Sequence, residues 1–411
     1  MHRGVQTADG GYIIAGEWAD NVTDVGPAGS VWYDHKKVPL LVKTNANVEE
    51  VVNRKYYQLY ELGWFMDVKQ TADGGYIAAG ASLNKSLQIY LVKTDSNLNL
   101  QWSKTFGGGP EAFAVEQTSD GGYLIAGGWT NSTPSGTDNA YIIKTDANGQ
   151  SVWNKAYGGE DDTTAYTINK TADGGYIVGG TKVPHGSQFF TGWLFKISKD
   201  GDPMQINQTY GEGSNNLIIS VKQTADGGYI AAGAITPKES NNTYGWLFKV
   251  NAQGELIESH KDQYNNNTNN RFLSVEPTKD GGYIVAGRTT FANNSSAAYI
   301  AKFDSTLKQK LWDATYNFEE HSDCSIGSIQ QTKDGGYFFV GRAGAQWPFT
   351  GGAGWAAKLD PEPPPPTLLQ QIGSGATPYA NQIIPAVIAT VIGGILVAIL
   401  TSVLLGRRQN K

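Results

Sequence analysis

The motif Thr-x-Asp-Gly-Gly-Tyr-x-x-x-Gly occurs seven times in this chain of 411 residues. Successive motif aspartates are 64, 47, 53, 53, 54 and 54 residues apart, and they are Asp9, Asp73, Asp120, Asp173, Asp226, Asp280 and Asp334. A period near 50 residues is typical of a repeat architecture. The chain is therefore expected to consist of seven copies of one small structural unit.

A single repeat predicts four short strands. In residues 112–159, the runs 113–118, 123–129, 140–145 and 151–157 are rich in apolar and β-branched residues. Turn sequences separate them, and Asp-Gly between two such runs is a strong hairpin signal. No run places apolar residues at helical spacing over ten or more positions, which argues against a helical solenoid.

Four antiparallel strands per period of about 50 residues match the blade of a β-propeller. We predict an all-β fold in which residues 1–360 form a seven-bladed β-propeller of four-stranded antiparallel blades. A β-helix or an open array of hairpins is the alternative.

A lysine recurs near the end of the third strand of every repeat. Our hypothesis is that each motif aspartate pairs with the lysine of its own blade, because the two chain positions lie at the same blade end. The alternative is a solvated lysine, since surface ion pairs contribute only about 0–1 kcal/mol. Either role is structural. The lysines are Lys43, Lys93, Lys144, Lys196, Lys249, Lys302 and Lys358.

The repeat resembles the Asp-Gly-Gly-Tyr repeats of archaeal and bacterial cell-surface propeller proteins, over nearly all of residues 4–360. That resemblance implies a surface-exposed propeller that binds a ligand or partner, and it supplies no catalytic residues. The turn Thr145–Gly149 with Trp153 is loosely similar to the Asp-box of sialidase-type propellers, but its spacings are each one residue longer.

The C-terminal part of the chain predicts a membrane anchor. Residues 383–405 form an uncharged run of 23 residues, long enough as a helix to span a bilayer. Arg407, Arg408 and Lys411 follow, so the positive-inside rule places residues 406–411 in the cytoplasm and the propeller outside. Residues 361–382, rich in Pro and Gly, form a semi-rigid stalk. We expect a single-pass cell-membrane protein with an extracytoplasmic, monomeric propeller.

The seventh repeat lacks a fourth strand, because Asp360 runs directly into the proline-rich stalk. Residues 2–7 read as part of a first strand, with no signal peptide before them. We therefore expect a signal peptide and a closing strand to lie upstream of Met1.

Composition narrows the class of partner. The formal charge is −6, and the three basic tail residues contribute +3, so the rest of the chain carries −9. An acidic ectodomain argues against nucleic acid and anionic headgroups as partners. The single cysteine, Cys324, excludes an intrachain disulfide and is expected to be buried near a blade junction.

Asn-x-Ser/Thr sequons suit a glycosylated surface protein. Asn169 also lies in a sequon, but in a predicted strand, so we regard it as incidental. The glycosylation candidates are Asn21, Asn84, Asn131, Asn207, Asn241, Asn266, Asn293 and Asn294.

Up-and-down connectivity sorts the loops onto two faces. The Asp-Gly-Gly turns and the turns between strands three and four share one face, here named the turn face. The loops between strands two and three and the links between repeats share the other, the loop face. Function is more often carried by variable loops, so we place the binding site on the loop face. Its aromatic candidates are Trp18, Trp32, Tyr33, Trp129, Phe189, Phe190 and Trp347.

The links between repeats carry the acidic candidates Glu160, Asp161, Asp162, Glu319 and Glu320. Carboxylates that converge at a channel mouth can bind Ca²⁺. No link contains an Asp-x-Asp-x-Asp-Gly loop, so we expect solvated acids, no metal site and no cofactor. Glu17 and Arg342 occupy one repeat position and are expected to form a charge pair on ring closure.

The sequence thus favours a module that binds carbohydrate or a surface protein. One alternative is a cell-surface glycoside hydrolase or lyase, which needs two carboxylates about 5–10 Å apart. The link acids do not single out such a pair, and no nucleophile triad, nucleotide loop or zinc spacing occurs. A purely structural envelope component is the third possibility.

Overall fold

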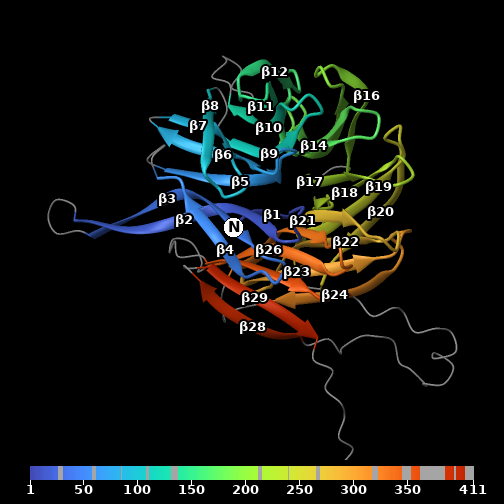
Figure 1. Cartoon of the computed structure of the whole chain (residues 1–411). Helices are drawn as coiled ribbons and strands as arrows, with labels where there is room; N and C mark the ends of the chain where they lie inside the picture. The colour runs from blue at the N-terminus through green and yellow to red at the C-terminus, as the bar shows by residue number, and fades with distance from the viewer. Residues whose placement is uncertain are drawn as a thin grey trace, which may run out of the picture.

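The structure is a computed structural model of residues 1–411. It describes the whole chain except residues 26–30, 58–61, 85, 108–110, 131–137, 212–214, 239, 265–268, 317–322, 345–352, 362–384, 393–394 and 403–411. The described residues form an all-β fold without a helix, and its sheets are arranged as a ring (Figure 1).

Six repeats each form a four-stranded antiparallel unit in which sequence neighbours pair. The first three contain β1 (Arg3–Gln6), β2 (Tyr12–Val25), β3 (Val31–Thr44), β4 (Glu50–Lys55), β5 (Leu62–Gln70), β6 (Tyr76–Asn84), β7 (Ser86–Thr94), β8 (Leu100–Phe106), β9 (Glu111–Gln117), β10 (Tyr123–Thr130), β11 (Asp138–Thr145) and β12 (Ser151–Tyr157).

The next three contain β13 (Asp162–Lys170), β14 (Tyr176–Val183), β15 (Thr191–Ile197), β16 (Pro203–Tyr210), β17 (Asn216–Gln223), β18 (Tyr229–Ile235), β19 (Tyr244–Val250), β20 (Leu256–Asp262), β21 (Asn269–Pro277), β22 (Tyr283–Thr290), β23 (Ser296–Phe303) and β24 (Lys310–Tyr316).

The seventh repeat has three antiparallel strands, β25 (Asp323–Gln331), β26 (Tyr337–Gly344) and β27 (Ala353–Leu359). The outer edge of β27 pairs in parallel with β29 (Ile395–Ser402), which forms an antiparallel hairpin with β28 (Pro385–Ile392). In the other six repeats the fourth strand is antiparallel to the third.

Of the run 383–405, where a helix is expected, the structure describes residues 385–392 and 395–402, and both are strands. The segment is rich in Ile and Val, which favour strands, and Gly393-Gly394 separates β28 from β29. Its apolar character is equally compatible with a helix, so the sequence pattern did not decide between them. Among the described residues, no helix is long and apolar enough to cross a membrane.

Glycine is required at the two motif positions for different physical reasons. The first has a positive φ in every repeat, between 81° at Gly74 and 92° at Gly335, which favours glycine. At the second, a Cβ atom would meet backbone of the third strand. Built on Gly122, it would lie 2.1 Å from the carbonyl oxygen of Thr145.

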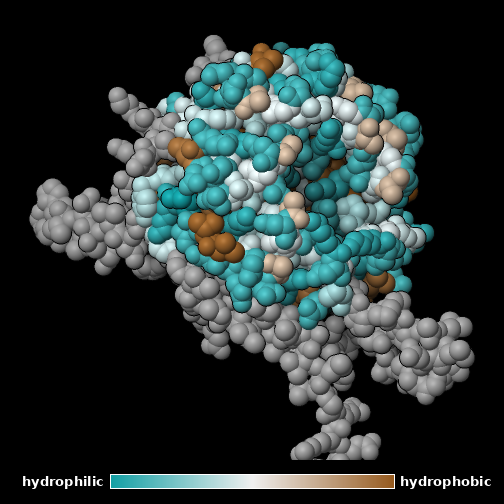
Figure 2. Space-filling model, viewed as in Figure 1, coloured by the Kyte–Doolittle hydropathy of each residue, from teal (hydrophilic) through white to brown (hydrophobic). Residues whose placement is uncertain are grey.

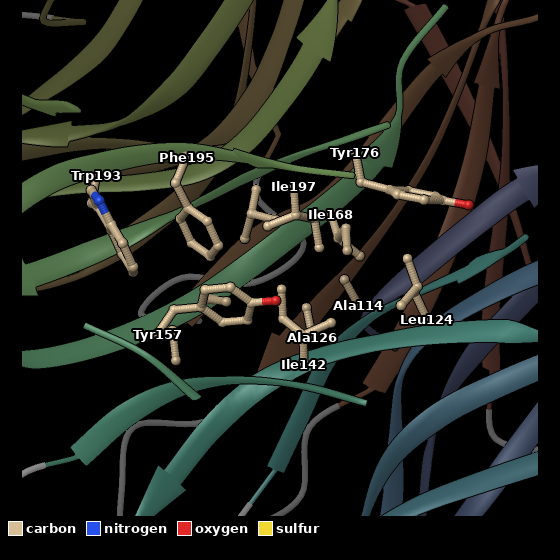
Figure 3. Close-up of a cluster of buried hydrophobic side chains, with 13 residues drawn as sticks. Ala114, Leu124, Ala126, Ile142, Tyr157, Ile168, Tyr176, Trp193, Phe195 and Ile197 are labelled. Atoms are coloured by element: carbon tan, nitrogen blue, oxygen red, sulfur yellow. The ribbon is translucent and has the colours of Figure 1, made fainter. Parts of the chain in front are cut away.

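The core lies between neighbouring sheets. Seven buried clusters occur among the described residues, one at each junction, and the junction between repeats seven and one is among them. Figure 3 shows the cluster between repeats three and four, where Ala126 and Ile142 face Ile168 and Phe195. Each large apolar side chain buried in this way contributes about 1.5–3 kcal/mol.

Repeat seven joins repeat one through side chains rather than a shared strand. The buried amide of Gly4 donates to Ser328 Oγ at 3.0 Å, and the amide of Gln6 donates to Gln330 Oε1 at 3.0 Å. The rings of Tyr12 and Phe338 stack with centroids 3.8 Å apart. These contacts close the ring within residues 1–361.

A glutamine clasp recurs around the ring. The glutamine before the motif threonine accepts a hydrogen bond from the turn of the preceding repeat, as Gln70 does from Ala8 at 2.7 Å. The clasp occurs at five junctions, with Gln6, Gln70, Gln117, Gln223 and Gln331 as the acceptors. Lys170 and Pro277 occupy the corresponding position at the other two junctions.

We predict that Ser328→Ala destabilises the protein by about 1–3 kcal/mol, because the buried amide of Gly4 then lacks an acceptor. Urea unfolding measures the change. Ser151→Ala, at an exposed position of β12, is the matched control and should alter stability by less than about 0.5 kcal/mol. Equal stability of the two variants would contradict closure through this contact.

Candidate functional site

The first strands of the repeats line a central channel with polar side chains. A cavity of about 210 Å³, here named the channel cavity, is bounded by β1, β5, β13, β17, β21 and β25. Hydrophilic residues predominate on the face seen in Figure 2, including around its hollowed centre. In repeats two, four, five, six and seven the polar lining residues lie two and four positions before the motif threonine, and repeat one contributes Arg3, Gly4 and Val5.

Charges in and beside the channel are paired. Lys222 Nζ lies 3.2 Å from Glu276, and Lys69 Nζ lies 3.9 Å from Glu116. Burial raises the pKa of Glu116, and Lys69 offsets part of this effect. Burial alone would lower the pKa of Lys69, but the carboxylates of Asp67 and Glu116 hold it above its usual value.

The remaining channel groups connect adjacent repeats. Asp67 is buried, accepts a hydrogen bond from the amide of Val115 at 3.0 Å and lies 3.9 Å from Arg3. Ser220 and Ser274 accept from amides of the following repeat. The described channel therefore has a structural role and offers no unpaired acid and base for catalysis.

A second cavity, of about 480 Å³, opens where the channel reaches the turn face. It is named here the mouth cavity, and its lining residues are Gln6, Thr7, Ala8, Gln70, Lys279, Gln330, Gln331, Thr332 and Lys333. Sequence reasoning missed it, because the uniform turns suggested a face without function. The available signal was the lysine that replaces Ala or Ser inside the motif of repeats six and seven.

Every motif aspartate is paired with the lysine of its own repeat on the turn face. The shortest of these contacts are Lys196–Asp173 and Lys358–Asp334, and the distances elsewhere are 2.6–3.1 Å. The ammonium groups are mostly buried while the carboxylates are about half exposed; the side chain of Lys302 is 0% exposed.

These pairs shift the acidity of the aspartates. Hydrogen bonds from Lys196 and then Thr171 lower the pKa of Asp173 to about 2, and Lys249 has the same effect on Asp226. At Asp280 partial burial opposes ionisation, but the hydrogen bonds from Lys302, Thr278 and the amide of Gly282 together outweigh it, and the pKa falls to about 2.

The aromatic candidates are not gathered at one place in the described structure. Trp18 is half-buried, packs against the cluster between repeats seven and one, and has Lys55 Nζ 3.5 Å from its ring centroid. The backbones of Trp32 and Tyr33 lie in β3 and that of Trp129 in β10, but their side chains are not described; Trp347 lies outside the described residues.

Phe189 and Phe190 lie on the β14–β15 loop, residues 184–190, which is held at both ends. The amide of His185 donates to Asp161 Oδ1 at 2.7 Å, and the carbonyl of Phe190 accepts from the amide of Asn216 at 2.8 Å. Within the loop, the amide of Phe189 donates to Ser187 Oγ at 3.0 Å. The loop thus presents Phe189, 50% exposed, from a fixed backbone.

The described acidic candidates, Glu160, Asp161 and Asp162, are consecutive residues of one link. Asp161 pairs with Lys182 at 2.6 Å, which lowers its pKa, and Asp162 accepts from the amide of Asp138 at 2.9 Å. Glu160 is exposed. Glu319 and Glu320 lie outside the described residues. Among the described residues, no group of three potential metal ligands occurs.

The expected Glu17–Arg342 pair is replaced by other partners. Glu17 is hydrogen-bonded to His2 Nε2 at 2.5 Å and lies 3.8 Å from Lys37 Nζ. Glu17 and Arg342 occupy equivalent repeat positions, but His2, which precedes β1, binds Glu17 instead. Arg288, at the corresponding place in repeat six, lies 3.8 Å from Asp323.

The modification candidates are divided between described and undescribed side chains. Asn207, Asn241, Asn293 and Asn294 are exposed, and Asn294 has a positive φ of 63°. The side chains of Asn21, Asn84, Asn131 and Asn266 are not described. Asn169 lies in β13 and donates to the carbonyl of Val221 at 2.9 Å, and Cys324 is buried.

The comparisons with known proteins support the fold alone. No protein-family model matches the sequence, and no curated protein matches it. The solved structures similar to this chain include a polysaccharide lyase of family PL25, an ulvan lyase, with a TM-score of 0.55, 10% identity, and coverage of 84% of this chain and 89% of that chain.

Puromycin hydrolase is also similar, with a TM-score of 0.50, 11% identity, and coverage of 82% of this chain and 49% of that chain. The β-propeller domain of the Trilobed protease from Pyrococcus furiosus has a TM-score of 0.46 and 12% identity, with coverage of 86% of this chain and 93% of that chain. The all-β fold of six four-stranded antiparallel units is consistent with the similarity to the ulvan lyase.

We predict that acid weakens the fold as the Asp–Lys pairs are lost. An aspartate with a folded pKa of about 2 and an unfolded value of about 3.9 binds fewer protons when folded. Its contribution is present above pH 4 or so and declines as the pH falls toward 2. Denaturant unfolding between pH 5 and pH 2 should show this decline.

Asp226→Asn should make that pH dependence shallower, because one depressed carboxyl is removed. Asp200→Asn is the control, since Asp200 is an exposed turn residue. If both variants keep the parental pH dependence, the Asp–Lys pairs do not carry the acid sensitivity.

Proposed function

We propose that this chain is a membrane-anchored, extracytoplasmic, seven-bladed β-propeller whose loop face binds carbohydrate or another surface protein. The observation that carries the proposal is the β14–β15 loop, which presents a half-exposed phenylalanine from a backbone clamped by Asp161 and Asn216. An aromatic ring held in this way suits stacking on a sugar ring or insertion into a partner's pocket. Because the loop backbone is already fixed, binding costs little further conformational entropy.

The engagement of the link acids favours binding over catalysis. Asp161 is paired with Lys182 and fixes the loop, while Asp162 holds the start of β11. An acid that already has charged and backbone partners is a poor general base, because its pKa is held low. The same acids are well suited to keep the loop in one conformation.

The path of the chain supports an outward-pointing loop face. The end of β27 pairs with the start of β26, since Leu359 lies opposite Tyr337, directly after the turn motif. Pro361 follows, and its Cβ lies 3.8 Å from the position a Cβ on Gly335 would occupy. The chain therefore leaves the ring at the turn face, and a C-terminal anchor would leave the loop face directed away from the membrane.

The anchor itself is proposed from residues 383–405. The hairpin β28–β29 leaves one edge of β28 without a strand partner among the described residues. In a bilayer such an edge would carry unpaired backbone groups, which lipid cannot satisfy, whereas a helix satisfies them internally. We therefore propose that this uncharged run adopts a transmembrane helix in lipid, with Arg407 and Arg408 on the cytoplasmic side.

We predict that Phe189→Ala weakens binding about 3- to 10-fold, as expected for the loss of an aromatic contact worth about 0.5–1.5 kcal/mol. The full chain, in a non-glycosidic detergent, is screened on an array of microbial glycans and surface proteins, and affinities for the hits are then measured. Val152→Ala is the matched control, because Val152 is 61% exposed on the outer strand β12.

Two outcomes would contradict this proposal. If Phe189→Ala binds every hit as tightly as the parent chain, the loop is not the site. If a glycan is cleaved and Asp161→Asn abolishes the cleavage, the hydrolase or lyase alternative is favoured. Release of reducing ends or of unsaturated uronates is recorded beside binding to detect turnover.

We predict that the full chain stays with the membrane pellet in alkaline carbonate, whereas a chain ending at Gln382 is released. The apolar run of 23 residues is the reason for this difference. Recovery of the folded full chain in the carbonate supernatant would contradict the anchor and would support pairing of β29 with β27.

A further inference from the structure

The mouth cavity combines hydrogen-bond donors and positive charge in a way that the proposed loop-face function does not use. Its nine lining residues include two lysines and four glutamines and no carboxylate. Its volume of about 480 Å³ lies within the range of about 300–1,000 Å³ that is usual for small-molecule sites.

The two lysines are held in place by backbone carbonyls. Lys279 Nζ donates to the carbonyl oxygens of Thr332 at 3.3 Å and Lys333 at 2.7 Å. Lys333 Nζ donates in the same way to Thr7 at 3.4 Å and Ala8 at 3.1 Å. An ammonium group has three N–H donors, so each lysine keeps one donor beyond these two contacts.

Neither ammonium group is neutralised by a carboxylate in the part of the chain that the structure describes. The adjacent aspartates are already committed, Asp280 to Lys302 and Asp334 to Lys358. Deeper in the channel, the pairs Lys69–Glu116, Lys222–Glu276 and Arg3–Asp67 balance one another. The mouth cavity thus carries a local surplus of two positive charges in a chain of formal charge −6.

The glutamines add donors rather than acceptors. The Oε1 atoms of Gln70 and Gln330 accept from the amides of Ala8 and Gln6, at 2.7 and 3.0 Å. The Nε2 groups of Gln70 and Gln330 donate no hydrogen bond to another described residue. Gln6 and Gln331 use both ends of their amides on the turns. The free hydrogen-bonding capacity of the cavity is therefore that of donors.

From these contacts we infer that the mouth cavity is a binding site for an anionic group, a carboxylate, sulfate or phosphate, held between Lys279 and Lys333. Such a group accepts several hydrogen bonds and compensates two fixed cations, and charge-assisted bonds of this kind are the strong ones. The group can belong to a free small molecule, such as a uronate, or to a lipid headgroup, since the chain leaves the ring on this same face.

The test uses the full chain in a zwitterionic detergent at low ionic strength. Titration calorimetry with glucuronate, inorganic sulfate and inorganic phosphate should show saturable binding at one site for at least one anion. The affinity should fall about tenfold or more in Lys279→Gln and in Lys333→Gln, and it should weaken as salt is added. Lys333→Arg should keep most of the affinity, because the charge and donors remain.

Lys199→Gln is the matched control. Lys199 is an exposed lysine on a turn between strands three and four of the same face, outside the cavity, and its charge is paired with Asp200. This control should bind as the parent chain does. Thermal unfolding of all variants separates lost binding from lost folding, since Lys279 and Lys333 also connect neighbouring repeats.

A parallel experiment distinguishes the source of the anion. The chain ending at Gln382 keeps the ring contacts but lacks the apolar run, and its sedimentation with phosphatidylglycerol vesicles, against phosphatidylcholine vesicles, tests the lipid headgroup. Binding only to the anionic vesicles, lost in the two glutamine variants, supports the site with lipid as its ligand. If no anion binds saturably, or if Lys199→Gln reduces binding as much as the cavity variants do, the inference is overturned. Phe189→Ala leaves this site intact, so the two proposals fail independently.

Discussion

Seven mostly buried ammonium groups hold this fold together. Each belongs to a lysine near the end of the third strand, and each is matched by the aspartate of its own turn. The lysine side chains are largely buried but the carboxylates are about half exposed, so water screens each pair and limits its contribution to the free energy of folding. At Lys43, the ammonium group also donates to the carbonyl oxygen of Ser96 in the next repeat at 3.5 Å, so this pair connects two repeats. The motif is thus both the turn of a hairpin and part of a junction.

Local patterns were sufficient to predict the repeat. Asp-Gly-Gly between apolar runs predicted the hairpins, and the position of Asp120 and Lys144 at the same blade end predicted the ion pair. Most such features depend on residues within about 25 positions of one another, although Asp9 and Lys43 are 34 positions apart. Their physical causes, positive φ and strand alternation, are visible in the sequence.

The features that the sequence did not reveal depend on distant residues or on ambiguous composition. Ser328 and Gly4 meet across the ring, and nothing in either sequence neighbourhood identifies the other as its partner. His2 takes the place expected for Arg342 beside Glu17, because a comparison of equivalent repeat positions leaves out the residues that precede the first strand. The mouth cavity arises only when the ends of four repeats converge, and the run over residues 383–405 suits both a helix and the hairpin β28–β29.

The two faces carry different chemistry. The loop face presents a fixed aromatic ring, and its described acids are engaged in holding loops. The turn face is uniform around its rim but not at its centre, where Lys279 and Lys333 break the repeat pattern. Uniform turns therefore do not exclude function, because a single substitution within the motif changes the charge of the shared opening.

The glutamine clasp has a mechanical consequence. It connects the turns at five junctions but not at the two where Lys170 and Pro277 replace the glutamine. These two junctions divide the ring into a short arc, repeats four and five, and a long arc that runs from repeat six through repeat one to repeat three. Within each arc the turns are linked in an unbroken series, whereas the two seams rely on other contacts, such as the Lys222–Glu276 pair between repeats five and six.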